Sequence, residues 1–253
     1  PEFSTTRAEL AQKSVDAILD FGEKGFPGIL VETIAIFINN LAAPANTKVF
    51  SLTHRLHLTQ PQAYIFDPEL PYWIIYRNQL FDSVCRKLDF DVFEVFRDRQ
   101  LTNKLLSSSG ELRVLKSRNL SDDGKAILDI PGYDSYISYA AAKPLSVFQY
   151  LDAPNVYLTP NMTYKPRMMK KPPHCVVNGS LAILIPKGGI VPTEKQLAYF
   201  SSEEYRAFYQ IARNFQTRSL NVDACSVFFY GLLRDEAKPA PEKFDTSVQL
   251  SFL

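Results

Sequence analysis

The chain is poor in cysteine. Its 253 residues include three cysteines, Cys85, Cys175 and Cys225, which are far apart and form no Cys-x-x-Cys pair. An odd number of widely spaced cysteines excludes the usual disulfide framework and the usual structural zinc site. We therefore expect a reducing, cytoplasmic environment for this protein.

Histidine and the common catalytic motifs are also scarce. His54 and His57 are three residues apart in a predicted strand, so they would not share a face, and no carboxylate stands at a ligand-like offset. The sequence contains no Gly-x-Ser-x-Gly, Walker loop or His-Glu-x-x-His. Asp98 with Glu111 is a poor imitation of a nuclease carboxylate pair. We expect no metal site and no catalysis by this chain alone.

The net charge of the chain is close to zero, and its apolar runs are short. Lys and Arg number 28 against 27 Asp and Glu, so the formal net charge is +1. Attraction to phosphate must therefore come from local clusters rather than from a global field. No apolar stretch reaches the length of a membrane span. A hydrophobic content of 46% and a charged content of 22% fit a soluble globular protein of one or two domains.

Two stretches of the chain concentrate basic side chains. Residues 97–118 contain six Lys or Arg and two acidic residues, and residues 161–187 contain five Lys or Arg and no acidic residue. A single basic run is ordinarily a solvated face. Two such runs, both mixed with Asn and Tyr or Gln, favour contact with nucleic acid instead.

The polar loops in these stretches carry the side chains that DNA recognition needs. Arg can fork onto guanine, Asn and Gln can fork onto adenine, and Ser, Thr and Lys can hold phosphates. The candidate DNA-binding residues are Arg97, Arg99, Gln100 and Asn103 in a first loop, Lys116, Arg118 and Asn119 in a second, and Asn161, Tyr164, Lys165 and Arg167 in a third. The sequence therefore predicts a reader of double-stranded DNA.

Each candidate also has a structural interpretation. Arg97 with Asp98 fits a surface ion pair, Asn161 fits a turn residue, and Tyr164 fits a packing residue. A fourth polar segment, residues 213–221, has a similar composition. Its asparagines also suit helix C-capping and turns, so we favour a structural role there.

The first ninety or so residues are predicted to form a separate unit. Apolar residues at helical spacing predict an amphipathic helix over residues 6–21. Residues 29–38 follow a break rich in Gly and Pro and fit either a strand or a buried helix. Further elements are predicted in this order: strands over residues 48–58 and 72–76, a helix over 79–88 and a strand over 91–96.

From residue 97 on, short strands are predicted to alternate with long loops. Strands are expected over residues 113–115, 155–158, 175–177, 180–185 and 226–233, and helices over 193–200 and 202–214. Asn178-Gly179 between two apolar runs predicts a hairpin. Ser201 or Ser202 is expected to cap the last helix. The tail over residues 238–241 is expected to be loose.

Five segments resemble the C-terminal part of type II adenine-specific DNA methyltransferases. They are FRDRQ at residues 96–100, VLKSRN at 114–119, VYLTPNMTY at 156–164, NGSLAILIP at 178–186 and RNFQTRSLNV at 213–222. The resemblance covers most of residues 21–231. It implies a parent enzyme in which a Rossmann-like domain binds S-adenosylmethionine and flips the adenine, while a target recognition domain reads the site, as in the Taq-type enzymes. FGEKGF at residues 21–26, continuing to Ile38, resembles the closing elements of that catalytic domain.

Two motifs of that family are missing from this chain. Neither the glycine-rich cofactor motif nor the Asn-Pro-Pro-Tyr motif is present. A base-flipping enzyme needs the paired prolines and the aromatic ring to hold the extruded adenine. The chain is therefore predicted to hold no cofactor and to be inactive alone, with S-adenosylmethionine bound by its parent enzyme.

The resemblance also sets the expected architecture. The fold is predicted to be α+β, a mixed sheet with short strands, long loops and several helices, preceded by a remnant of an α/β methyltransferase domain. Residues 1–3 look like a cloning remnant, residues 4–75 like the end of the catalytic domain, and residues 76–253 like the target recognition domain. The expected partner is double-stranded DNA in a restriction–modification system, with no membrane and with the oligomeric state open.

Three other functions remain as alternatives. A specificity subunit of a restriction enzyme would show two similar halves, and no repeat is visible. A nuclease-linked half of a restriction enzyme would need a carboxylate cluster that binds metal. A protein–protein interaction module would use the 13% aromatic content for its interface.

Overall fold

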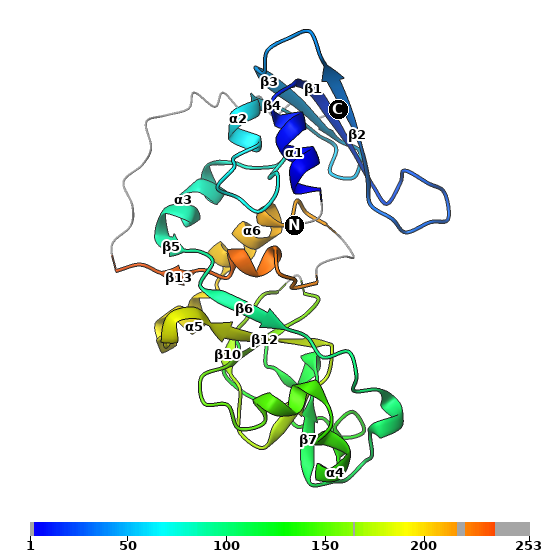
Figure 1. The fold of residues 1–253 in the computed structure, drawn as a ribbon, viewed down its shortest axis with the longest axis vertical. Helices are drawn as coiled ribbons and strands as arrows, with labels where there is room; N and C mark the ends of the chain where they lie inside the picture. The colour runs from blue at the N-terminus through cyan, green and yellow to red at the C-terminus, as the bar shows by residue number, and fades with distance from the viewer. Residues whose placement is uncertain (1–2, 164, 217–220, 236–253) are drawn as a thin grey trace. The chain divides into compact units, whose positions relative to one another are not determined.

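The computed structural model describes residues 3–163, 165–216 and 221–235 (Figure 1). These residues divide into two compact units. The first unit contains residues 3–86 and 210–216, and the second contains residues 87–163, 165–209 and 221–235. The division falls between Arg86 and Lys87, whereas the resemblance placed a boundary after residue 75.

The described residues confirm the α+β class. They form six α-helices, and the strands are grouped in several small sheets joined by long loops. None of the helices in the described part of the chain is both long enough and apolar enough to cross a membrane.

The first unit is built on a four-stranded sheet with the order β2-β1-β3-β4. β1 is antiparallel to β2 and parallel to β3, and β3 and β4 form an antiparallel pair. The elements of this unit are α1 (Ser4–Ala11), β1 (Ser14–Gly22), β2 (Thr33–Asn39), β3 (Asn46–Ser51), β4 (Leu56–Pro61), α2 (Gln62–Ile65) and α3 (Gln79–Lys87). The ambiguous residues 29–38 thus contribute a strand, and the predicted strand over residues 48–58 is two strands with a turn between them.

The predicted helix over residues 6–21 is wrong in its second half, where β1 lies. Val15 and Ile18 are three residues apart and both are completely buried, a spacing typical of a helix. The register between β1 and β2 shifts between Val15 and Ala17, and this irregularity turns residues 15 and 18 to the same side. A bulged strand therefore reproduced the apolar spacing of a helix.

The predicted strand over residues 72–76 is also wrong, because this segment has no strand neighbour. The side chain of Asn214 takes that place: its Nδ2 donates to the Trp73 carbonyl at 2.9 Å, and its Oδ1 accepts from the Ile75 N–H at 2.9 Å. The apolar run was real, since Ile74 and Tyr76 are buried. A side chain satisfies the backbone here instead of a sheet.

The second unit contains a four-stranded sheet of order β10-β9-β12-β6, a three-stranded sheet of order β11-β7-β8 and the pair β13-β5. Its strands are β5 (Leu88–Asp89), β6 (Phe93–Phe96), β7 (Leu112–Leu115), β8 (Ser135–Ile137), β9 (Tyr157–Pro160), β10 (Met169–Lys170), β11 (Cys175–Val177), β12 (Leu181–Pro186) and β13 (Leu232–Leu233). Its helices are α4 (Tyr139–Ala142), α5 (Glu194–Tyr199) and α6 (Glu203–Ala212), whose last residues are counted with the first unit. Short 3-10 turns lie at Asn103–Leu105, Ser117–Asn119, Ser146–Tyr150, Lys187–Gly189 and Ser226–Phe229.

The predicted helices at residues 79–88, 193–200 and 202–214 are confirmed as α3, α5 and α6. Thr193 and Gln196 form a capping box at the start of α5. Ser202 Oγ accepts the N–H of Tyr205 at 3.1 Å, which makes Ser202 the N-cap of α6. Ser202 is thus one of the two caps predicted for α6, and the Thr193–Gln196 capping box of α5 was not predicted.

The predicted hairpin at Asn178-Gly179 is wrong, although both of its strands exist. β11 pairs in parallel with β7, whereas β12 pairs antiparallel with β6 and β9 in the other sheet. The turn between them therefore connects two sheets instead of reversing one strand onto the next. Partners distant in sequence decided the pairing.

The predicted strand over residues 226–233 is mostly wrong, since Ser226–Phe229 is a 3-10 turn and only Leu232–Leu233 is a strand. Asp223 Oδ1 accepts the Ser226 N–H at 2.7 Å and starts the turn. Phe229 and Tyr230 then pack into a buried aromatic cluster with rings of α6. The predicted tail at residues 238–241 lies outside the described residues.

Candidate functional site

The turn at residues 178–180 is the point where the predicted recognition loops meet. We call residues 97–103 the first loop, residues 116–119 the second, and residues 161–163 with 165–167 the third. The Asn178 side chain fixes the turn, because its Oδ1 accepts from the Ser180 N–H at 3.1 Å and from the Ser180 hydroxyl at 2.6 Å.

The first and second loops contact this turn directly. A Cβ atom on Gly179 would lie 2.7 Å from the carbonyl oxygen of Asp98, so a glycine is needed where the first loop approaches. Ser180 Oγ accepts the Ser117 N–H of the second loop at 2.9 Å. Two loops that are separate in the sequence are therefore anchored on adjacent residues.

The third loop reaches the same turn through Asn161, which is 7% exposed. Its backbone N–H donates to the Ser180 carbonyl at 2.9 Å, and its Nδ2 donates to the Gly179 carbonyl at 3.1 Å. Its Oδ1 accepts from Arg97 Nη1 at 3.3 Å and from the Val222 N–H at 3.1 Å. Asn161 is therefore a junction that positions Arg97, and its amide is fully occupied inside the protein.

The second loop is held from below by Asn119, which is completely buried. Its Oδ1 accepts the Lys116 N–H at 2.9 Å, and its Nδ2 donates to Asp134 Oδ1 at 2.7 Å and to the Leu128 carbonyl at 3.0 Å. A buried side chain with these bonds cannot reach a DNA base in this conformation. We therefore do not count Asn119 among the side chains that would contact DNA.

The two cationic side chains of the second loop, Lys116 and Arg118, both lie against the ring of Tyr133. Lys116 Nζ lies 3.9 Å from the ring centroid and donates to the Tyr133 carbonyl and to Ser135 Oγ. Burial lowers the pKa of Lys116, and the neighbouring Arg118 adds to this effect. Arg118 Cζ lies 4.7 Å from the same centroid, but this side chain is exposed. The ring thus holds an exposed guanidinium in a defined position.

Arg167 is a buried clamp between the second and third loops. It is 8% exposed, and its guanidinium donates to three backbone carbonyls, those of Lys165, Ser117 and Leu120. Burial lowers its pKa. The Arg167 guanidinium holds the second and third loops together through these bonds. We therefore do not count Arg167 among the side chains that would contact DNA.

Most polar side chains of the first loop face solvent. Arg99 and Asn103 are exposed, and their side chains make no hydrogen bond or ion pair within the described residues. Gln100 is exposed too, but its Oε1 accepts the Ser146 N–H at 2.7 Å. Asp98 is buried, and its Oδ2 fixes the loop by accepting the Leu101 N–H at 2.8 Å.

The end of the third loop carries one further exposed cation. Lys165 is 54% exposed and pairs with Asp122 at 3.2 Å. An exposed ion pair of this kind contributes little to stability, so Lys165 can exchange Asp122 for a more highly charged anion such as a phosphate. Tyr164 lies outside the described residues.

The fourth polar segment has internal partners. Arg213 is buried and donates to the Tyr72 hydroxyl at 3.3 Å, and Asn214 bonds to residues 73 and 75 as described above. No group of three or more His, Cys, Asp or Glu in the described residues is placed to hold a metal ion. The described part of the chain thus offers a set of cationic loops but no acidic metal centre.

Sequence reasoning missed three residues that organise the site. Gly179 and Ser180 were predicted to belong to a hairpin. Tyr133 was not predicted as a site residue, although its ring contacts both Lys116 and Arg118. A Tyr in a turn 15 residues after Arg118 gives no signal by spacing. Only the pairing of β7 with β8 brings the two segments together.

Asp134 gives the site a testable pH dependence. Burial would raise the pKa of Asp134, but bonds from the Ile130 N–H, Asn119 and Arg113 outweigh it and hold that pKa below its usual value. A depressed pKa means that the stabilisation is complete above about pH 4 and is lost as the pH falls further. We expect wild type to be more stable than Asp134→Asn at pH 7 and the difference to shrink below about pH 4. Urea unfolding at several pH values measures this; a constant difference would contradict it.

Comparison with known proteins adds no family. The chain matches no protein-family model, and no curated protein is significantly similar to it in sequence.

Proposed function

We propose that this chain reads double-stranded DNA, as the target recognition region of an adenine-specific DNA methyltransferase of a restriction–modification system. The observation that carries the proposal is the meeting of the three loops at residues 178–180. They were selected by composition alone, and they are anchored to one another through Gly179, Ser180 and Asn161. Methyl transfer, with S-adenosylmethionine as cofactor, is assigned to the parent enzyme.

The loop residues divide into supports and contacts. Asn119, Asn161 and Arg167 are buried and bonded to the backbone, so they hold the loops in place. The contacts are the exposed side chains that form no hydrogen bond to the backbone, Arg99, Asn103, Arg118 and Lys165, whereas Gln100 is exposed but bonded to the Ser146 N–H. Reading DNA requires such rigid supports, because a base-reading side chain must be held at a fixed position on the groove.

Arg118 is the contact that the geometry defines best. Stacking on Tyr133 restricts its side chain, and no described carboxylate pairs with it. A guanidinium held in this way can fork onto guanine O6 and N7 or onto a phosphate, with less side-chain entropy to lose than a free arginine. Arg99 is a second exposed arginine of these loops, and its side chain has no partner in the described residues.

A titration of the chain against a randomised duplex pool, with selection and sequencing of the bound fraction, tests this function. We expect one recurring DNA motif and an affinity that falls steeply with salt. If Arg118 reads a base, Arg118→Ala should cost about 1–3 kcal/mol at one position of the motif; if it holds a phosphate, the variant should weaken binding to all sequences and reduce the salt slope by about one.

Arg206→Ala is the matched control, because Arg206 is an exposed arginine of the same unit that lies on α6 and outside the three loops. It should leave the motif unchanged. Absence of any enriched motif, together with equal small effects of Arg99→Ala, Arg118→Ala and Arg206→Ala, would refute specific readout by these loops.

A further inference from the structure

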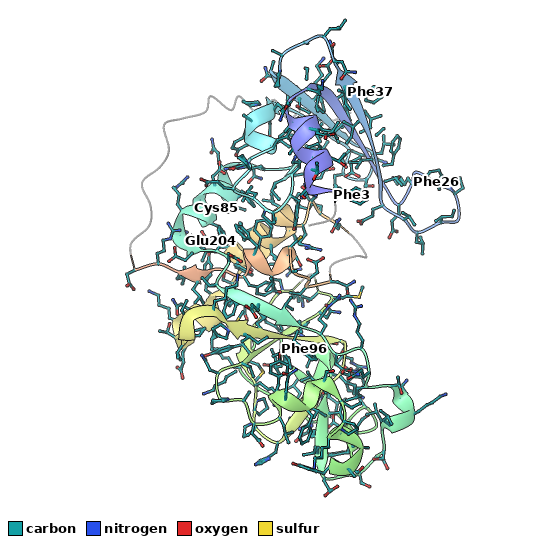
Figure 2. All side chains as sticks on the ribbon, viewed as in Figure 1. Phe3, Phe26, Phe37, Cys85, Phe96 and Glu204 are labelled. Atoms are coloured by element: carbon teal, nitrogen blue, oxygen red, sulfur yellow. The ribbon has the colours of Figure 1, made fainter. Side chains whose placement is uncertain are left out.

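The hairpin of β1 and β2 exposes an unusual amount of apolar surface. Figure 2 labels two of its side chains, Phe26 on the loop and Phe37 on β2. Exposed fractions between 40% and 100% occur at Phe26, Ile29, Leu30, Val31, Ile34, Phe37, Ile38 and Leu41. A contiguous sequence of large exposed apolar residues marks an interaction surface in a soluble protein.

In the part of the chain that the structure describes, one edge of β2 pairs with no strand. Within the described residues β2 lies at the edge of its sheet, with β1 as its strand neighbour. Its sequence, TIAIFIN, contains no charge and no proline, and these are the features that usually block edge pairing. The occupant of this edge is therefore expected to be an extended strand.

The low charge of the hairpin limits the kinds of molecule that can bind this edge. Residues 26–45 include one charged residue, Glu32, and no Lys or Arg. Nucleic acid and anionic membranes are recognised by basic side chains, so neither fits this surface. An apolar, uncharged protein strand does fit.

β2 itself is such a strand, and it is complementary to a second copy of itself. In an antiparallel pair centred on Ile36, Ile34 lies opposite the partner's Ile38, and Ala35 lies opposite the partner's Phe37. β2 contains no charged residue, so no like charges meet across the two-fold axis of this strand pair.

We propose that the edge of β2 opposite β1, which pairs with no other described strand, is a homodimer interface in which two copies pair β2 antiparallel about Ile36. The pairing joins the two four-stranded sheets into one and sets the exposed apolar residues of the two copies side by side on each face of the new strand pair. This proposal is independent of DNA binding.

Sedimentation equilibrium of the full chain, from about 1 to about 200 micromolar, tests the proposal. We expect a monomer–dimer equilibrium. Ile34→Lys should raise the dissociation constant at least about tenfold, because it places a charge in the apolar strand pair. Val191→Lys is the matched control, since Val191 is 68% exposed and lies in the other unit, and it should leave the constant unchanged.

A charge-pair rescue tests the register. The Ile34→Lys variant and the Ile38→Glu variant should each be monomeric on its own. An equimolar mixture should form a heterodimer in which the new lysine of one copy faces the new glutamate of the other. Both sites are exposed, so circular dichroism should show folded variants. The proposal is overturned if the full chain stays monomeric at the highest concentration, if Ile34→Lys still dimerises as wild type, or if the mixture fails to associate.

Discussion

Asn161→Leu is expected to lower the free energy of unfolding of the second unit by about 2–4 kcal/mol and to weaken DNA binding to all sequences. Leucine has the same branched heavy-atom skeleton as asparagine but cannot form hydrogen bonds, so four side-chain bonds are lost, those with Arg97 Nη1, the Val222 N–H, the Gly179 carbonyl and Asn221 Oδ1. The Val222 N–H keeps its second bond, to the backbone carbonyl of residue 161. Each lost bond in a buried position costs about 1 kcal/mol. The loss of these side-chain bonds also frees Arg97 and weakens the attachment of the third loop to the turn at residues 178–180, where the bond from the residue 161 N–H to the Ser180 carbonyl remains.

Asn155→Leu is the matched control for this variant. Asn155 precedes β9, as Asn161 follows it, and its side chain makes two hydrogen bonds, to the Ile190 carbonyl and the Tyr157 hydroxyl. It contacts none of the three loops through these bonds, so stability should fall by about 1–2 kcal/mol and DNA binding should be retained. Hydrogen exchange of the amides in β9 and β12, with the DNA titration, measures both effects. Equal loss of binding in the two variants would show that Asn161 has no special role.

Arg77→Met is expected to destabilise the first unit by about 3–5 kcal/mol. Arg77 is 16% exposed and pairs with Asp67 at 2.7 Å and Asp82 at 2.8 Å. It also donates to the Tyr64 carbonyl at 3.0 Å and lies 4.5 Å from the Tyr64 ring centroid. Removing the cation leaves two partly buried carboxylates without compensation, which is the costly way to break such a network.

Trp73 reports this unit specifically. It is the single tryptophan of the chain and stacks on Phe66 with 3.8 Å between ring centroids. Urea unfolding followed by tryptophan fluorescence should therefore show the shift of Arg77→Met. Adding Asp67→Asn and Asp82→Asn to the same variant should recover part of the loss, because the unpaired charges are then removed. A triple variant no more stable than the single one would mean that packing, rather than charge, explains the effect.

Local signals predicted several elements of the fold correctly. The capping residue Ser202 marked the start of α6, helical patterns located α3 and α5, and apolar runs located β6, β7 and β11. These features depend on contacts between residues close in the sequence, so one sequence is enough to find them. The composition of the three loops also singled them out, because their polar side chains are read directly from the chain.

The sequence by itself determined the α+β class, the helices with clear caps and the positions of the polar loops. The tertiary structure alone decided that residues 14–22 are a bulged strand, that residues 178–180 link two sheets, and that Tyr133 carries Arg118. It also decided that Asn119, Asn161 and Arg167 are buried supports while Arg99 and Arg118 face solvent. The reason is that strand pairing and burial depend on residues far apart in the sequence, and local periodicity cannot specify which distant partner completes a sheet or covers a side chain.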